Sequence, residues 1–159
     1  MNVLTINAEE CVFCRTCEAG CSAIKEGESN LSKSRISVVP FYEEYFYCPT
    51  VCRQCTVPAC IPACPEEAIF RNEDTGVVEL EQSKCSGCRM CLDACPFGAI
   101  VMVDGLAAKC DLCGGDPWCV RLCQYGALHY GESNEISTSR RLKVAERMRE
   151  SYLAASQEK

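Results

Sequence analysis

The cysteines of residues 85–95 have the type and spacing that bind an iron-sulfur cluster. They follow the pattern C-x2-C-x2-C-x3-C-P, which runs from Cys85 to Pro96. In this pattern three closely spaced thiolates bind three corners of one [4Fe-4S] cubane, and the fourth thiolate reaches a second cluster. A tetrahedral zinc site needs only two C-x2-C pairs, so the third evenly spaced cysteine and the Cys-Pro step exceed what zinc requires. The motif therefore predicts electron-transfer chemistry, with zinc or disulfide bonding as the alternative.

The same motif occurs four times in degenerate form. The first group is C-x2-C-x2-C-x3-C over residues 11–21, and the second is C-x2-C-x4-C-x3-C-P over residues 52–65. The third is the motif described above, and the fourth is C-x2-C-x5-C-x3-C over residues 110–123. The four groups use sixteen of the 17 cysteines, which is four complete sets of cubane ligands, and leave Cys48 over. The count predicts four [4Fe-4S] clusters.

The prolines indicate which groups share clusters. The second and third groups end in Cys64-Pro65 and Cys95-Pro96, as the two halves of an ordinary dicluster ferredoxin do, whereas Cys21 and Cys123 lack the proline. We therefore predict that the two inner groups pair with each other and that the two outer groups do likewise. The predicted ligand sets are Cys11, Cys14, Cys17 with Cys123; Cys110, Cys113, Cys119 with Cys21; Cys52, Cys55, Cys60 with Cys95; and Cys85, Cys88, Cys91 with Cys64.

Short turns and strands must position these groups. Three groups continue alike, as Cys-Pro-Glu-Glu-Ala-Ile, Cys-Pro-Phe-Gly-Ala-Ile and Cys-Gln-Tyr-Gly-Ala-Leu. Each predicts a tight turn whose apolar pair packs back on a cluster before a short strand begins. A Gly-containing turn at residues 72–76 separates two strands of a hairpin. Strands are predicted at residues 3–6, 35–41, 69–71 and 77–80, a helix at residues 18–25, and a polar loop at residues 26–34.

The predicted fold class is α+β, with two bacterial-type dicluster ferredoxin folds, one inserted in the other, and a C-terminal helix. The inner dicluster unit covers residues 51–104. The outer unit is discontinuous and covers residues 1–50 and 105–135. Residues 136–159 are the predicted C-terminal helical docking arm.

The arm is predicted to be helical from about Ser137 to Ala155, with Ser137, Thr138 or Ser139 as its N-cap. Its apolar stripe consists of Leu142, Ala145, Met148, Tyr152 and Ala155. The arm is basic while the rest of the chain is acidic, which favours docking on another subunit or on a second copy of the chain. Packing against its own body is the alternative.

Composition excludes several function classes. The net charge is −6 at pH 7, and each oxidised cubane with four thiolates adds about two negative charges, so nucleic acid is not expected as a partner. Residues 1–6 show no signal peptide and no apolar run approaches 18 residues, which predicts a cytoplasmic protein without a membrane anchor. In a reducing cytoplasm, clustered cysteines bind metal.

Several features together resemble the polyferredoxin electron-transfer subunits of the dimethyl sulfoxide reductase and formate dehydrogenase type. They are the order of the four groups, Pro58 two residues before Cys60, and Lys84 and Lys109 directly before the third and fourth groups. The resemblance covers about residues 3–130 and implies the same pairing of groups. The small size and the short insertion at residues 114–118 most resemble the iron-sulfur subunit of tungsten-dependent aldehyde oxidoreductase. The corresponding subunits of formate hydrogenlyase and of tungsten-dependent benzoyl-coenzyme A reductase fit the same description.

We predict an anaerobic electron-transfer subunit without catalytic residues of its own. A fully Cys-ligated cubane has no open iron, and the sequence contains no G-x-G-x-x-G, P-loop or H-E-x-x-H motif. The expected partners are a catalytic tungsten- or molybdenum-pterin subunit and a second redox subunit or carrier, which could be flavin- or nicotinamide-linked. The alternatives are a free soluble polyferredoxin shuttle and an interaction module held together by zinc or disulfides.

Three cations lie next to the predicted ligands. Lys84, Lys109 and Arg89 can raise the potential of a nearby cluster because a positive charge favours its more negative reduced state. A solvated charge beside a turn is the alternative for each of them. Cys48 is predicted to be a small buried hydrophobic residue, with a role as a spare ligand as the alternative.

Overall fold

The computed structural model describes residues 2–134, 138, 141–142, 144–146 and 148–149, in which short elements follow one another closely. The strands are β1 (Asn2–Ile6), β2 (Ile36–Phe41), β3 (Phe46–Val51), β4 (Ile69–Arg71), β5 (Val78–Leu80), β6 (Ile100–Val103), β7 (Leu106–Lys109) and β8 (Leu128–Glu132). The helices are α1 (Thr16–Glu26), α2 (Met90–Ala94) and α3 (Trp118–Arg121), with 3-10 turns η1 (Ala8–Glu10), η2 (Leu31–Lys33), η3 (Gln82–Lys84) and η4 (Leu112–Gly115).

The strands form small antiparallel two-stranded sheets. β2 pairs with β3, β4 with β5, and β6 with β7, so each of these sheets joins strands that are neighbours in sequence. β1 pairs with β8, with Ile6 opposite Leu128, which brings the first strand and the end of the fourth Cys group side by side. Antiparallel sheets combined with short helices confirm the predicted α+β class.

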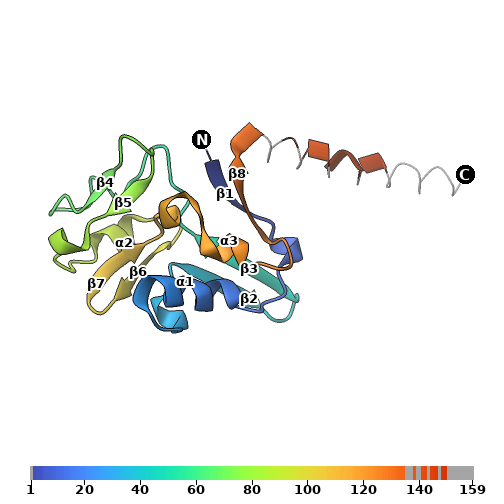
Figure 1. Ribbon diagram of the computed structural model, residues 1–159, viewed down its shortest axis with the longest axis horizontal. Coiled ribbons are helices and arrows are strands. Elements are labelled where there is room, and N and C mark those ends of the chain that lie inside the picture. Colours follow the sequence, from blue (N-terminus) through green and yellow to red (C-terminus); the bar gives the residue numbers. More distant parts are fainter. Residues whose placement is uncertain (1, 135–137, 139–140, 143, 147, 150–159) are drawn as a thin grey trace, which may run out of the picture.

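The described body has two parts with separate cores. Figure 1 shows β4, β5, α2, β6 and β7 at one end, and α1, α3, β1, β2, β3 and β8 at the other. The first core contains Ile36, Val51 and Leu112 together with Cys17 and other cysteines. The second core contains Ile69, Val78, Ile100, Ala107 and Cys91. Cysteines make up a large share of both cores, so the packing depends on what those thiols bind.

Each predicted strand and the predicted helix is present with similar bounds. The three predicted turns also follow their Cys groups: the apolar pairs Ala68-Ile69, Ala99-Ile100 and Ala127-Leu128 are buried, and β4, β6 and β8 begin at the second residue of each pair. The loop at residues 26–34 contains one short turn, η2. The strands β3 and β7 were not predicted.

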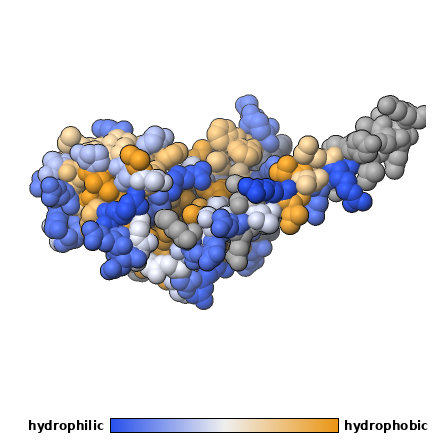
Figure 2. Space-filling view, turned by 90° about the horizontal axis from the view of Figure 1, so that it is seen from above, coloured by the Kyte–Doolittle hydropathy of each residue, from blue (hydrophilic) through white to orange (hydrophobic). Residues whose placement is uncertain are grey.

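The predicted docking arm is described only in part. The described residues among 133–149 are helical, and the helix already includes Ser133 and Asn134. Thr138 is therefore not the N-cap: its hydroxyl donates to the Asn134 carbonyl at 2.9 Å, as a threonine inside a helix does. Leu142 and Met148 are exposed, and hydrophobic residues are visible on this segment in Figure 2. Ser137, Ser139, Tyr152 and Ala155 lie outside the described residues.

A search of the described helices for one long and apolar enough to cross a membrane finds none.

Candidate iron-sulfur sites

Four pockets in the body are each lined by four cysteines. We call them sites 1 to 4, and their cysteines are Cys11, Cys14, Cys17 and Cys123 (site 1); Cys21, Cys110, Cys113 and Cys119 (site 2); Cys52, Cys55, Cys60 and Cys95 (site 3); and Cys64, Cys85, Cys88 and Cys91 (site 4). The structure thus brings together the same four sets of residues that spacing and proline position predicted. With their open mouths the pockets measure about 300 to 380 Å³.

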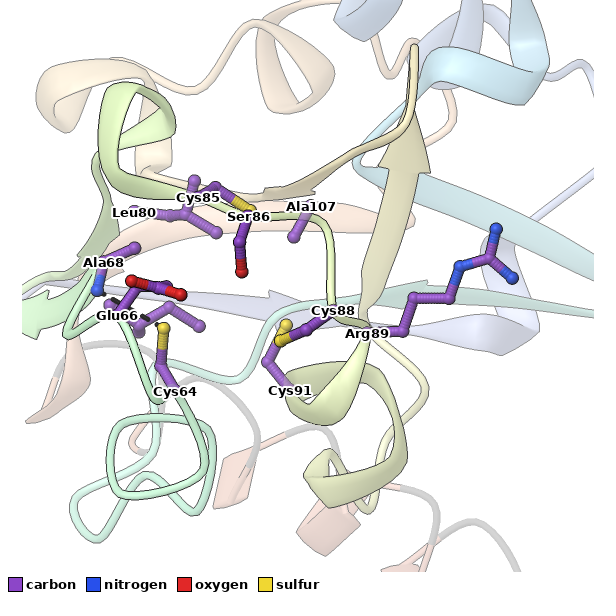
Figure 3. Close-up of a pocket in the computed structure, with 11 residues that line it drawn as sticks. Cys64, Glu66, Ala68, Leu80, Cys85, Ser86, Cys88, Arg89, Cys91 and Ala107 are labelled. Carbon is purple, nitrogen blue, oxygen red and sulfur yellow. Dashed lines mark hydrogen bonds between the residues drawn. The ribbon is translucent and has the colours of Figure 1, made fainter.

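Site 4 illustrates the arrangement. Cys85 and Cys88 come from the loop that leads into α2, Cys91 comes from α2 itself, and Cys64 comes from the preceding group. Figure 3 shows their sulfur atoms facing a common space, with the Arg89 side chain directed away from it. The backbone N–H of Ala68 donates to Cys64 Sγ at 3.3 Å. The site therefore collects thiols from two Cys groups in the three-plus-one manner of the motif.

The same backbone turn recurs in all four groups. The second residue between the first two cysteines has a left-handed backbone, at Phe13 (φ 58°), Gln54 (φ 48°), Gly87 (φ 73°) and Leu112 (φ 57°). Positive φ is uncommon for residues other than glycine and gathers at functional sites, where the surrounding structure must stabilise it. At Gly87 there is a further constraint, because a Cβ atom would collide with the Gly105 carbonyl oxygen.

Backbone N–H groups point at the thiols. Besides Ala68, the N–H groups of Arg35, Ala99 and Leu112 donate to the sulfurs of Cys21, Cys95 and Cys110, at 3.4, 3.5 and 3.4 Å. Hydrogen bonds of this kind stabilise a thiolate relative to a thiol and help to set the potential of an iron-sulfur cluster. Sites 2, 3 and 4 each have at least one such bond.

Burial acts in the opposite direction on several of these thiols. Removal from water raises the pKa of Cys17 and of Cys110 to about 12, and it also raises the pKa of Cys11, Cys60 and Cys91. A buried thiol of this kind stays protonated at neutral pH unless a positive charge compensates the thiolate. Metal binding supplies such a charge and releases the proton.

The donor sets fit [4Fe-4S] clusters. Each site offers four cysteine sulfurs, which is the complete ligand set of a cubane. Within the described residues no three His, Cys, Asp or Glu side chains converge closely enough to hold a single metal ion. All 17 cysteines are free of disulfide bonds. Four free thiols that line one pocket suit a cluster that takes a sulfur ligand at each iron.

The sites follow one another through the body. Cys119 of site 2 has its pKa raised mainly by burial and further by neighbouring thiolates, which include Cys17 of site 1. Cys110 of site 2 has its pKa raised by burial and then by Cys52 of site 3. Cys60 and Cys95 of site 3 pack against the second core together with cysteines of site 4, whereas Cys52 of site 3 packs against the first core. Sites 1, 2, 3 and 4 therefore lie in this order.

The structure separates the three cations that were predicted next to ligands. Lys109 is buried and lines site 3. Lys84 is exposed and pairs with Glu81 at 2.7 Å. Arg89 is exposed beside site 4. Cys48 is half-buried on β3 and does not line any of the four pockets.

Lys25 and Asp111 are among the polar residues at the sites that sequence reasoning missed. Lys25 of α1 pairs with Asp111 at 2.6 Å across the mouth of site 2, where both line the pocket. The Asp111 carboxylate also accepts a hydrogen bond from the Cys113 N–H at 3.0 Å, which shapes the fourth Cys group. Burial alone would raise the pKa of Asp111, but the Lys25 ammonium and the backbone N–H of Cys113 together outweigh burial, so the pKa is lowered. The available signal in the sequence was an Asp directly after the first cysteine of a group, where its carboxylate can accept a hydrogen bond from the backbone of the same loop.

Comparison with known proteins identifies the family. Residues 43–133 match the family model of the 4Fe-4S dicluster domain. The chain belongs to this family. The chain is 37% identical over 123 residues to the polyferredoxin-like subunit of an aliphatic sulfonate oxidoreductase from Pyrococcus furiosus, a match that covers 76% of this chain and 70% of the relative. The chain is thus similar to iron-sulfur electron-transfer subunits of oxidoreductase complexes.

Other dicluster relatives are longer. The chain is 30% identical over 133 residues to the beta subunit of NADH-dependent phenylglyoxylate dehydrogenase from Aromatoleum evansii, which covers 81% of this chain and 30% of the relative. Among the curated relatives first found, the chain spans as little as 24% of the relative's length. Among solved structures, a chain in the active site complex BamBC of benzoyl coenzyme A reductase with benzoyl-CoA aligns with a TM-score of 0.51 and 27% identity, over 91% of this chain and 89% of that one.

Proposed function

We propose that this protein is an electron-transfer subunit that holds four [4Fe-4S] clusters, one in each of sites 1 to 4. The observation that carries the proposal is the set of four pockets, each lined by four cysteines and arranged in one continuous order. A bound cubane supplies reversible one-electron transfer. Because cysteines complete every ligand set, the sites leave no position for a substrate, and catalysis belongs to another subunit.

The proposed ligands are the sixteen cysteines of the four sites, arranged as two nested dicluster units. The outer unit consists of residues 1–50 and 110–135, and the inner unit is inserted within it. Support comes from the pairing of β1 with β8 and from the two separate cores. Since β7 pairs with β6, we extend the inner unit from residue 104 to the end of β7, at Lys109.

The proposed partners are a catalytic tungsten- or molybdenum-pterin subunit and a second redox subunit or carrier. Support comes from relatives named as subunits of selenate reductase and perchlorate reductase and as the polyferredoxin-like subunit of an aliphatic sulfonate oxidoreductase. Within this class, aldehyde oxidoreductase is the specific assignment that we propose. A free polyferredoxin shuttle is the second candidate, because the sites themselves do not require a permanently bound partner.

The experiment is anaerobic purification of a tagged chain from its native cell, followed by metal analysis. Four cubanes require about sixteen iron atoms per chain and a brown protein. Tungsten or molybdenum in the same fractions would identify a pterin partner, whereas iron alone with no second protein would favour the shuttle. A colourless protein containing zinc would overturn the proposed function.

A further inference from the structure

Lys109 is a buried cation at the junction between the inner and outer units. Only 6% of its surface is exposed, which is rare for a lysine without a paired carboxylate. Its Nζ donates to the carbonyl oxygens of Cys110, at 2.9 Å, and of Val78. Among the residues that the structure describes, its hydrogen-bond partners are backbone carbonyls, whose dipoles do not cancel a full positive charge.

A glutamine completes the network around this cation. Gln54 Nε2 donates to the same Cys110 carbonyl at 2.9 Å, and Gln54 Oε1 accepts from the Val78 N–H at 2.8 Å. Lys109 and Gln54 thus hold the same two backbone units, one in the fourth Cys group and one in β5. The ammonium group is fixed in place beside site 3, whose pocket it lines.

Site 3 differs from the other three sites in the charges that line it. Its pocket has two cations, the buried Lys109 and the exposed Arg53, and no carboxylate. Each of the other pockets has at least one carboxylate as well as a cation. The charged residues are Glu10 and Arg15 at site 1; Lys25, Arg35 and Asp111 at site 2; and Glu66 and Arg89 at site 4.

A buried charge has a stronger effect than an exposed one, because water screens it less. Reduction of a cubane with four thiolates from the [4Fe-4S]2+ to the [4Fe-4S]1+ level adds one electron, and the total charge changes from about −2 to about −3. An uncancelled cation beside the site favours the more negative state. The effect on site 2 is smaller, because Asp111 lies at that pocket and carries the opposite charge.

We propose that Lys109 is a positioning residue that raises the reduction potential of the cluster in site 3, so that this site takes the first electron entering the relay. This inference rests on the proposed function, since it requires a cluster in site 3. The electron comes from a low-potential reductant, which is a redox partner in the assembly and dithionite in the test. An electron held in site 3 lies at the junction of the two units.

The test is an EPR-monitored redox titration of the whole chain with Lys109→Gln and Lys109→Arg. Lys109→Gln removes the charge but keeps a hydrogen-bond donor, so one midpoint potential should move to a more negative value. Lys109→Arg keeps the charge, so the same midpoint potential should stay close to that of the wild type. The affected signal should be the one that Cys95→Ser alters or abolishes, which identifies site 3. Lys84→Gln is the matched control, because Lys84 also directly precedes a Cys group but is 54% exposed in its side chain and paired with Glu81.

A second measurement needs no Lys109 variant, only the wild type and Cys95→Ser, and decides the matter even if Lys109→Gln loses iron. When dithionite is added in less than one equivalent, the first EPR signal should be the one that Cys95→Ser alters. A first signal insensitive to Cys95→Ser, or equal shifts in Lys84→Gln and Lys109→Gln, would overturn the inference. If the wild type itself holds fewer than four clusters, the proposed function fails instead, and iron analysis separates the two cases.

Discussion

The side-chain amide of Gln54 lies 2.9 Å from the carbonyl oxygen of Cys110 and donates a hydrogen bond to it. The two residues are far apart in the sequence, one in the second Cys group and one in the fourth. Gln54 also accepts from the Val78 N–H, so a single side chain connects the loop of site 3, the loop of site 2 and β5. The relative placement of the two central sites depends on this connection.

Replacement of Gln54 by Ala should therefore weaken the junction. The buried Val78 N–H would lose its acceptor, which costs about 1–3 kcal/mol for an unsatisfied buried group. We expect visible absorption to be lost faster in guanidinium chloride under anaerobic conditions. Gln82→Ala is the control, since Gln82 is exposed in η3. Equal rates of loss in the two variants would show that the Gln54 hydrogen bonds do not stabilise the junction.

A second prediction concerns the loop of site 4. Gly87 and Gly27 both have left-handed backbones, with φ of 73° and 74°, but only at Gly87 would a Cβ atom collide with backbone, the Gly105 carbonyl. Gly27→Ala should cost about 1–2 kcal/mol from backbone strain alone. Gly87→Ala should cost more and should lower the temperature at which the protein loses its colour by a larger amount. If the two variants melt alike, the contact with Gly105 is not as tight as the structure indicates.

The ligand assignment predicts which cysteine variants lose iron. Cys14 lines site 1, whereas Cys48 lines none of the four pockets although both lie close enough to Cys11 to affect its pKa. Cys14→Ser should lower the iron content by about one to four atoms per chain, from a three-iron cluster to a lost cubane. Cys48→Ser should leave the iron content unchanged. An iron loss in Cys48→Ser equal to that in Cys14→Ser would make Cys48 a ligand.

Removal of the iron should unfold the protein. Cysteines form a large part of both cores, and buried thiols such as Cys17 and Cys110, with pKa values raised to about 12, would become neutral groups around empty pockets. Metal binding therefore supplies much of the folding free energy. We expect a chelated, iron-free sample to lose its dispersed amide signals in NMR. Native-like dispersion without iron would mean that the apolar contacts alone maintain the fold.

Much of the site could be predicted because local spacing determines it. Three cysteines of each set lie within one short segment of the chain, and a proline after the fourth cysteine of a group distinguishes inner from outer groups. The strands β3 and β7 were missed for local reasons. Pro49 lies inside β3, which is tolerated because a two-stranded sheet leaves one edge of each strand free. β7 follows the turn Asp104-Gly105, with φ of 50° and 86°, and an Asp-Gly pair is a signal for a hairpin turn. The strand was missed because its sequence is rich in alanine, which is depleted in strands.

The different environments of Lys84 and Lys109 could not be predicted from local sequence. Both residues directly precede a Cys group, and both are followed by Cys-x2-Cys. Lys84 ends η3 at the surface, whereas Lys109 ends β7 against Val78 of β5, a residue 31 positions away. Only the packing of distant elements distinguishes a screened cation from a buried one. The buried positive charge at site 3 could therefore be identified only from the structure.

The last prediction concerns the C-terminal arm, which we propose is used for assembly. No cysteine of sites 1 to 4 lies beyond Cys123, the lining of site 1 extends to Leu128, and β8 ends at Glu132, so the four sites are complete before the arm begins. Leu142, Val144 and Met148 are each more than half exposed, which leaves apolar surface for a partner such as the catalytic subunit or a second copy of the chain. A head-to-tail contact between copies would propagate unless the rotation closes it. Deletion of residues 137–159 should keep the iron content and lower the mass of the assembly in mass photometry. The triple substitution of Leu142, Val144 and Met148 by Ser should have the same effect. An unchanged mass in both variants would show that the arm does not hold the assembly together.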